Sequence, residues 1–377
     1  PFPCSHWNEG FALTNLGKVH AFENDWDHLV KPDAPVPPPV SFATETAAAA
    51  AFVIASAAAR EARPAVQAAA STTRCSSAPP IAKIMGAERL LILDGHHYAY
   101  RSFYAIRAMN APDGFPTNAL YGFINALRRM RARVAPTHIA VIWDGGLDEG
   151  RTEALPNYKA GRDPMPDDLE LQLDALDEWL NAAGLHSWCH EGVEADDVIG
   201  TLTRQAEAAG LPVVVASSDK DFFQLINPNV HLLNPNDKTD TLWQAEQVRA
   251  KTGVEPAQII DWLSLVGDSV DGIPGVRGVG PKTATKLLLE YRTVENLYSN
   301  LDDVKPDGLQ GRLREAKAEV QRNQELVALK EMAEWKTDLE DLRPGAGDYA
   351  TLHAQYTRWN FRSLLNELEA GRQGELL

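Results

Sequence analysis

Nine acidic residues stand where strands and helices are expected to begin or end, and carboxylates in such positions can bind metal ions. They are Asp94, Asp144, Glu194, Asp196, Asp197, Asp219, Asp221, Asp268 and Asp271. Each one alone is explained as well by a turn or a helix N-cap. Several of them brought together would repel one another unless cations neutralised them. Oxygen ligands select Mg²⁺ or Mn²⁺ over zinc, and a pair of such ions can hydrolyse a phosphodiester.

Three short apolar runs predict the strands that would bring these carboxylates together. The runs are residues 90–93, 138–143 and 212–216, and the aspartates that follow them are Asp94, Asp144 and, after two serines, Asp219. Amphipathic stretches predict helices over residues 118–134, 166–183 and 195–209. Strands that alternate with helices are typical of a parallel-sheet α/β domain. Ligands bind such a sheet at the carboxyl ends of its strands, where the aspartates stand.

No strands are expected after residue 252. Residues 256–266, 282–291 and 311–335 are expected to form helices instead. We therefore predict an α/β domain over residues 87–252, a helical domain over 253–343 and a tail over 344–377, in which residues 356–368 would form a last helix. Residues 1–86 are rich in proline, alanine, serine and threonine, which favours a disordered low-complexity extension. Met85 would then be the biological start, unless the extension is a targeting peptide.

Charge is distributed unevenly along the chain. The net charge of −16 argues against a nucleic-acid partner, because phosphate binding needs a basic surface. Residues 101–162 nevertheless carry nine basic and five acidic side chains, and residues 272–292 carry four basic side chains against one acid. Three scattered cysteines indicate neither a disulfide framework nor a zinc site. No apolar run is long enough to span a membrane, so we expect a cytoplasmic protein.

The sequence resembles the bacterial 5′→3′ exonuclease and flap endonuclease family, which includes the N-terminal nuclease domain of DNA polymerase I. Six segments match the motifs of that family in order, over about residues 88–334. They are residues 93–101, 142–144, 158–168, 192–200, 218–221 and 267–275. Residues 356–368 resemble the segment that follows this domain in the polymerase. The sequence departs from the family pattern at His96-His97 and at Ser217-Ser218, and we interpret the two histidines as non-ligands.

The resemblance implies a role for each candidate residue. Asp94, Asp144 and Asp196 would hold one metal ion, with Glu194 acting through water, and Asp219, Asp221 and Asp268 would hold a second. Asp197 and Asp271 would be auxiliary ligands. Lys159 and Arg162 would contact the scissile phosphate. The alternative interpretation is that both residues simply lie in a solvated loop. Arg101 would contact another phosphate, and Tyr158 would stack on an unpaired base.

Residues 273–284 contain glycines and a proline ahead of an expected helix. Such a loop can present backbone N–H groups and a helix N-terminus to a phosphate, although an ordinary helix–helix turn has the same composition. By resemblance this is a helix-three-turn-helix motif that grips duplex DNA and also binds a K⁺ ion through loop carbonyls. Its DNA-binding residues would be Gly275, Gly278, Gly280, Lys282 and Lys286. The cluster Arg128, Arg129, Arg131 and Arg133 is interpreted as a solvated helix face.

These observations predict an α/β, PIN-like nuclease core with a parallel sheet, a helical arch and a C-terminal all-helical DNA-binding domain. The expected activity is two-metal hydrolysis of DNA at flaps, nicks or 5′ ends, for replication or repair, with Mg²⁺ or Mn²⁺ as the cofactor. We expect a monomer whose partners are DNA with single-strand/double-strand junctions and a DNA polymerase. One alternative is a non-catalytic DNA-binding scaffold, which would not require so many acids. Another is a related RNA-cleaving nuclease, which the duplex-gripping motif disfavours.

Overall fold

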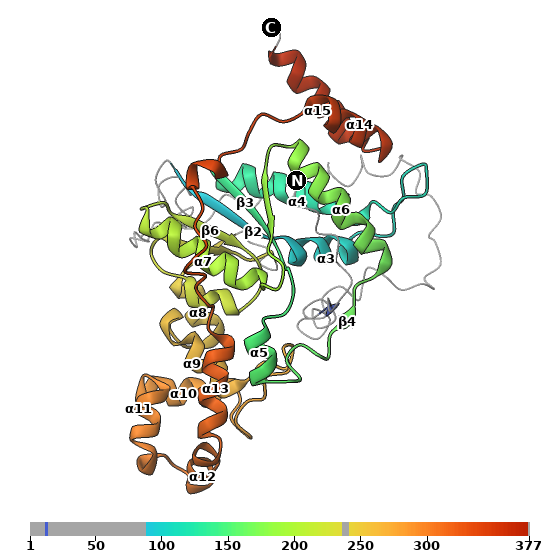
Figure 1. Ribbon diagram of the computed structural model, residues 1–377. Helices are drawn as coiled ribbons and strands as arrows, with labels where there is room; N and C mark the ends of the chain where they lie inside the picture. Colours follow the sequence, from blue (N-terminus) through green and yellow to red (C-terminus); the bar gives the residue numbers. More distant parts are fainter. Residues whose placement is uncertain (1–11, 14–87, 236–240, 376–377) are drawn as a thin grey trace, which may run out of the picture. The chain divides into compact units, whose positions relative to one another are not determined.

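The computed structural model describes residues 12–13, 88–235 and 241–375 (Figure 1). The predicted extension over residues 1–86 therefore lies outside the described residues, apart from the two-residue strand β1 (Ala12–Leu13), which pairs with β4 (Asp163–Pro164). None of the helices in the described part is long and apolar enough to cross a membrane.

The predicted parallel sheet is confirmed. In the described part of the chain, one six-stranded sheet has the order β5 (His186–Cys189), β3 (His138–Trp143), β2 (Leu90–Asp94), β6 (Val213–Ala216), β7 (Val230–Leu233), β8 (Leu242–Trp243). All neighbouring pairs are parallel except β7 with β8. The three strands expected from the sequence are the adjacent strands β3, β2 and β6. The sequence did not predict β5, β7 or β8.

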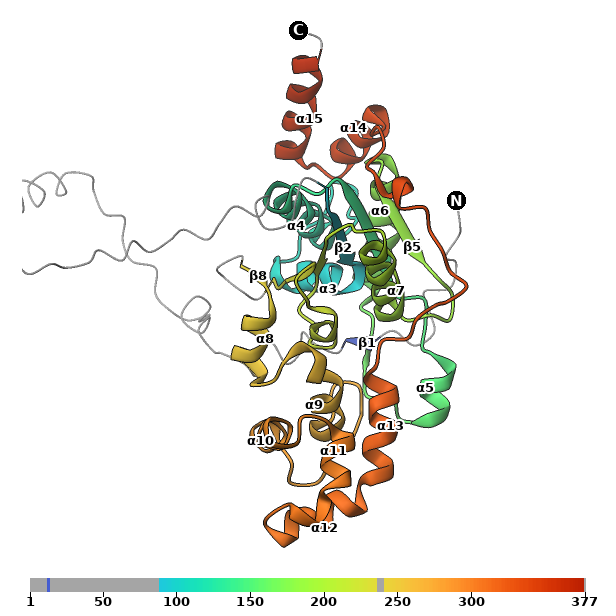
Figure 2. The same cartoon turned by 90° about the vertical axis from the view of Figure 1, so that its left-hand side faces the viewer.

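Both faces of the sheet are covered, which explains the continuous apolar runs of its strands. Successive residues of β2 point to opposite faces, so Leu90 and Ile92 join one buried cluster while Leu91 and Leu93 join the other. The second cluster contains residues from the helices α3 (Gly95–Ala105), α4 (Asn118–Val134) and α6 (Asp167–Ala182). The first contains residues from α7 (Ala195–Ala208), on the other face (Figures 1 and 2). The predicted bounds of α4 are confirmed.

A helical region follows the sheet, as predicted. Its elements are α8 (Ala245–Thr252), η2 (Pro256–Gln258), α9 (Ile259–Val266), α10 (Pro281–Tyr291), α11 (Val294–Ser299), η3 (Leu301–Asp303), α12 (Asp307–Glu315) and α13 (Lys317–Val327). Figure 2 shows α9 to α13 grouped together. The three domain limits proposed from the sequence stay predictions.

The expected single helix over residues 311–335 is wrong. Helices α12 and α13 are separate, and the chain after Val327 continues without helix along α7. We call residues 328–338 the strap. Side chains of α7 satisfy the strap backbone: Asp197 Oδ1 accepts from Lys330 N at 2.8 Å, and Gln205 Nε2 donates to Trp335 O at 2.6 Å. These tertiary hydrogen bonds outweigh the helical propensity of the segment.

The tail also differs from expectation. Two helices, α14 (Tyr349–Arg358) and α15 (Arg362–Glu375), replace the single helix expected over residues 356–368, and η4 (Leu339–Leu342) precedes them. The chain turns at Asn360, which has a φ of +57°, a conformation that asparagine tolerates better than most residues. Trp179 Nε1 on α6 donates to the Tyr356 hydroxyl at 2.9 Å. The tail therefore packs on the α/β domain, with a break between its two helices.

Candidate active site

Carboxylates from three adjacent strands meet at one edge of the sheet. Asp94 ends β2, Asp144 follows β3, and Asp219 lies three residues after β6. Asp94 also caps α3, because its Oδ1 accepts from His97 N at 3.0 Å, while its Oδ2 accepts from the Ser217 hydroxyl at 3.0 Å. Burial, together with the charges of Asp219 and Asp144, raises the pKa of Asp94 to about 7. Burial likewise raises the pKa of Asp144 to about 6.

The N-terminus of α7 adds two more acids to this edge. Glu194 precedes the helix and is buried, and Asp196 lies in its first turn. Burial raises the pKa of Asp196 well above its ordinary value, and the charges of Asp219 and Asp94 raise it further. The acids that the resemblance assigned to the first metal ion therefore lie near enough to interact electrostatically, although among the described residues no three of them have carboxylate oxygens all within 4.8 Å of one another.

A second group of acids lies beyond Asp219. Oxygen atoms of Asp221, Asp268 and Asp271 all lie within 4.8 Å of one another. Asp221 begins η1 (Asp221–Leu225), and burial with the charges of Asp219, Asp268 and Asp271 raises its pKa well above the ordinary value. Asp271 was expected to be auxiliary, but the structure places it with Asp221 and Asp268.

A tight loop holds Asp268 and Asp271 in position. Asp268 N donates to Ile273 O, and Ile273 N donates back to Asp268 O, both at 2.8 Å. The loop starts at Gly267, whose φ is +79° and where a Cβ atom would lie 2.3 Å from Gly275 N. The left-handed backbone and the close approach both require glycine at this position. Gly275, predicted to bind DNA, therefore also has a structural role in shaping the acidic loop.

The donors fit hard divalent cations. Every candidate ligand is a carboxylate oxygen, the type of donor that Mg²⁺ and Mn²⁺ prefer. The pKa values of four of these carboxyl groups are raised, which means that their ionised forms are unfavourable without a nearby positive charge. The four are Asp94, Asp144, Asp196 and Asp221. A bound cation would remove that penalty.

Two basic side chains contact the acids from the segment between α5 (Glu149–Ala154) and α6. Lys159 Nζ donates to Glu194 Oε2 at 2.6 Å, and Arg162 Nη2 donates to Asp271 Oδ1 at 2.8 Å. Lys159 is only 5% exposed, which argues against the solvated-loop alternative. Burial alone would lower the pKa of Lys159, but the charges of Asp271 and Glu194 raise it well above its ordinary value. The expected arch segment forms turns around these two residues rather than a helix.

Two predicted roles are corrected by the contacts. Tyr158 was expected to stack on an unpaired base, but its side chain is buried in the core and its hydroxyl donates to Glu194 Oε2 at 3.0 Å. Asp197 was expected to be an auxiliary metal ligand. Both of its carboxylate oxygens instead accept from the guanidinium of Arg151, at 2.7 and 2.9 Å. Asp197 is therefore engaged in a buried ion pair with Arg151.

Arg151 is a residue that the sequence analysis missed. Its buried guanidinium also lies 3.3 Å from Glu194 and donates to the carbonyl oxygens of Leu326 and Ala328, at 3.1 and 3.0 Å. One side chain thus joins α5, the start of α7 and the end of α13. Its partners lie 43 (194 − 151) to 177 residues away in the sequence, so no local pattern could have identified it.

The two histidines after Asp94 make contacts that support the site. His96 Nδ1 accepts from the backbone N–H of Asp144 at 3.0 Å, and burial lowers the pKa of His96 to about 3. The imidazole is therefore neutral and fixes the end of β3. His97 Nε2 lies 3.1 Å from the Ser218 hydroxyl. Ser217 and Ser218, the other departure from the family pattern, thus contact Asp94 and His97.

The other predicted DNA-binding residues lie in two places. Lys282 and Lys286 are exposed on α10, whose N-cap is Gly280, and Gly278 in the preceding loop has a φ of +74°. Arg101 lies elsewhere: it donates to Pro235 O at 2.9 Å and lines a separate cavity.

Comparison with known proteins assigns both domains. The model for "5'-3' exonuclease, N-terminal resolvase-like domain" matches residues 89–253, and that for "5'-3' exonuclease, C-terminal SAM fold" matches residues 254–350. The 5'-3' exonuclease of Aquifex aeolicus is 36% identical over 280 residues, which cover 74% of this chain and 95% of the relative. DNA polymerase I of Pseudomonas aeruginosa is 39% identical over 299 residues. That match covers 76% of this chain and 32% of the polymerase, so the chain spans about a third of its length.

Solved structures agree in fold. Bacteriophage T5 5'-exonuclease with bound divalent metal ions has a TM-score of 0.55 at 22% identity, covering 64% of this chain and 90% of that one. The catalytic core of Rad2 in complex with a DNA substrate has a TM-score of 0.53 at 14% identity, covering 77% of this chain and 95% of that one. With both domain models matched and nearly the whole of the Aquifex exonuclease covered, the chain belongs to the 5'-3' exonuclease family.

Proposed function

We propose that this chain is a divalent-metal-dependent nuclease that hydrolyses DNA phosphodiesters near single-strand/double-strand junctions. The observation that carries the proposal is that carboxylates at the ends of β2, β3 and β6 and at the start of α7 lie near the buried Lys159, while the partly buried Arg162 pairs with Asp271 of the second acidic group. Membership of the family supports it, and the T5 and Rad2 structures carry divalent metal ions and DNA, respectively.

The acids divide into two candidate metal sites. Asp94, Asp144, Glu194 and Asp196 would hold one cation, and Asp219, Asp221, Asp268 and Asp271 would hold the other. Bound divalent cations supply an activated water at neutral pH and polarise the phosphoryl oxygens. We favour Mg²⁺, with Mn²⁺ as a substitute, because all of the donors are oxygens.

Lys159 and Arg162 would stabilise the negative charge that develops on the phosphate. Their positive groups already contact carboxylate oxygens, Lys159 at Glu194 and Arg162 at Asp271. The same groups can donate to phosphate oxygens placed between them, and such charge-assisted hydrogen bonds strengthen as charge accumulates in the transition state. Their burial limits competition from water, so each contact would contribute more than it would at the surface.

The helical region would hold the duplex. The N-terminus of α10 follows Gly278 and Gly280, and exposed Lys282 and Lys286 lie one turn apart on the helix. Backbone N–H groups and lysines of this kind bind phosphates without reading sequence. A K⁺ ion on the loop carbonyls, a monomeric state, a cytoplasmic location and a polymerase partner in replication or repair complete the proposal.

Two alternatives remain for the same fold. A non-catalytic scaffold that binds DNA would gain nothing from buried carboxylates aimed at phosphate, since they would repel it. A nuclease that cleaves RNA could use the same acids, and only the substrate would distinguish it.

Cleavage assays on labelled nucleic acids test the proposal. Flap, nicked and single-stranded DNA and matched RNA are incubated with the full chain in Mg²⁺, in Mn²⁺ and in EDTA. We expect cleavage of the flap or nicked DNA in either metal and none in EDTA. Equal cleavage of DNA in EDTA would contradict the metal requirement, and preferential cleavage of RNA would support the second alternative.

A further inference from the structure

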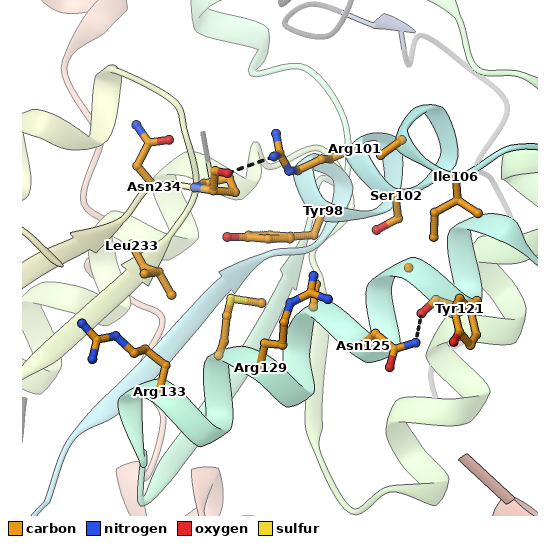
Figure 3. Close-up of a pocket in the computed structure, with 15 residues that line it drawn as sticks. Tyr98, Arg101, Ser102, Ile106, Tyr121, Asn125, Arg129, Arg133, Leu233 and Asn234 are labelled. Atoms are coloured by element: carbon orange, nitrogen blue, oxygen red, sulfur yellow. Dashed lines mark hydrogen bonds between the residues drawn. The ribbon is translucent and has the colours of Figure 1, made fainter. Parts of the chain in front are cut away.

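A cavity of about 520 Å³ lies between α3, α4 and the end of β7, apart from the acidic cluster (Figure 3). None of the nine candidate ligands lines it. Its volume falls within the roughly 300–1,000 Å³ typical of small-ligand sites. The residues used below are Tyr98 and Arg101 on α3, and Tyr121, Arg129 and Arg133 on α4.

Three guanidinium groups line this cavity from two helices. Figure 3 shows the Tyr98 ring between Arg101 on one side and Arg129 and Arg133 on the other. Among the described residues that line the cavity, none is acidic. Burial lowers the pKa of Arg101, and the nearby positive charge of Arg129 lowers it further. Like charges gathered in a partly enclosed site favour binding of an anion.

The four arginines of α4 divide by the face on which they lie. Arg129 and Arg133 are four residues apart and line the cavity together, as neighbours on one helix face do. Arg128 is paired with Glu367, and Arg131 is exposed and does not line the cavity. All four arginines are exposed, as expected of a solvated helix face, and Arg129 and Arg133 in addition line the cavity.

We propose that this cavity, the α3–α4 site, binds the phosphate of a nucleotide. Guanidinium groups bind phosphate in the geometry of their paired N–H donors, and the Tyr98 and Tyr121 side chains provide aromatic surface beside them. The choice of a nucleotide over another phosphate rests on the proposed nuclease function. The nucleotide comes either from a DNA strand or from a released mononucleotide, which share the same phosphate chemistry.

Binding measurements in EDTA test the site separately from catalysis, because carboxylates without cations repel phosphate. The full chain is titrated with deoxyadenosine 5′-monophosphate and, separately, with uncleaved flap DNA. The variant carries Arg129→Gln and Arg133→Gln, both on exposed positions of α4, and the matched control carries Arg131→Gln. We expect the double variant to lose affinity by about tenfold or more, the scale of one lost charged hydrogen bond, while the control retains it.

The two probes identify the source of the phosphate. Loss of mononucleotide affinity in the double variant supports a site for free nucleotide, and loss restricted to flap DNA supports a site for a strand phosphate. Unchanged affinity for both probes, or an equal loss in Arg131→Gln, overturns the proposal. Cleavage by the wild-type chain in Mg²⁺ is measured in parallel, so that failure of the proposed nuclease function is seen independently.

Discussion

The acidic edge of the sheet and the loop before α10 both carry predicted functional residues, but they are built differently. At the sheet edge the charged groups are buried or largely buried and form ion pairs, as Lys159 does with Glu194 and Arg162 with Asp271. On α10 the charged groups are exposed, and Lys282 and Lys286 point to solvent. Buried charges cost free energy unless they are paired, whereas exposed lysines cost little. Substitutions at the first region should therefore change chemistry and folding, and those at the second should change only DNA affinity.

The largest effect is expected from removing a carboxylate charge at the sheet edge. Asp94→Asn and Asp144→Asn should each lower the single-turnover cleavage rate by several orders of magnitude, because each removes a metal ligand without changing its shape. Flap DNA should still bind, since the α10 region is intact. Asp174→Asn, on the exposed surface of α6, is the control. Cleavage at the wild-type rate by both variants would exclude these residues as ligands.

Metal binding can also be followed through stability in the same variants. A ligand that binds only the folded state raises the melting temperature, so Mg²⁺ should stabilise the wild type against heat. The shift should be smaller in Asp94→Asn. An undiminished shift would indicate that Mg²⁺ stabilises the protein at some other place.

Substitution of Arg151 tests how much its buried ion pair with Asp197 contributes to the free energy of unfolding. Arg151→Met would leave Asp197 buried without its partner, which typically costs about 3–5 kcal/mol in the free energy of unfolding. Adding Asp197→Leu should recover part of this loss, because the unpaired charge is then removed. Denaturant unfolding of both variants gives the measurement. Equal stability of wild type and Arg151→Met would show that the ion pair contributes nothing to the fold.

Lys159 separates catalysis from binding within the acidic region. Lys159→Ala should lower single-turnover cleavage by roughly a hundredfold or more, as loss of one oxyanion-type donor does. Affinity for flap DNA should fall by only about tenfold, and Arg162→Ala should behave similarly. Equal losses of rate and affinity would make Lys159 part of the general DNA-binding surface instead.

Burial and the sequence distance between interacting residues explain which features the sequence could predict. The strands β2, β3 and β6 are continuous apolar runs because both of their faces are buried, and their parallel order places Asp94, Asp144 and Asp219 together. Strand β5 has the sequence His-Ser-Trp-Cys and is only half buried, so it carries no such signal. The strap has the composition of a helix and is held instead by side chains of α7. Tyr158 and Asp197 were misassigned because their partners, Glu194 and Arg151, are distant in the sequence.

The smallest expected effect, and the one most specific to the exposed region, concerns α10. Lys282→Ala combined with Lys286→Ala should weaken duplex binding equally for all sequences, because lysines that contact phosphates carry no sequence information. Each phosphate contact releases counterions, so the slope of log affinity against log salt should decrease by about one per lysine, or about two for the pair. The single-turnover rate at saturating DNA should stay close to wild type, since neither lysine belongs to the acidic cluster. Affinity measured at several salt concentrations provides the test, with Lys305→Ala, an exposed lysine outside α10, as the control. If the slope is unchanged, the loop before α10 is a structural turn and the duplex binds elsewhere. If the cleavage rate falls together with the affinity, α10 and the acidic edge of the sheet are not independent. The contrast between a buried catalytic region and an exposed DNA-binding region then does not hold.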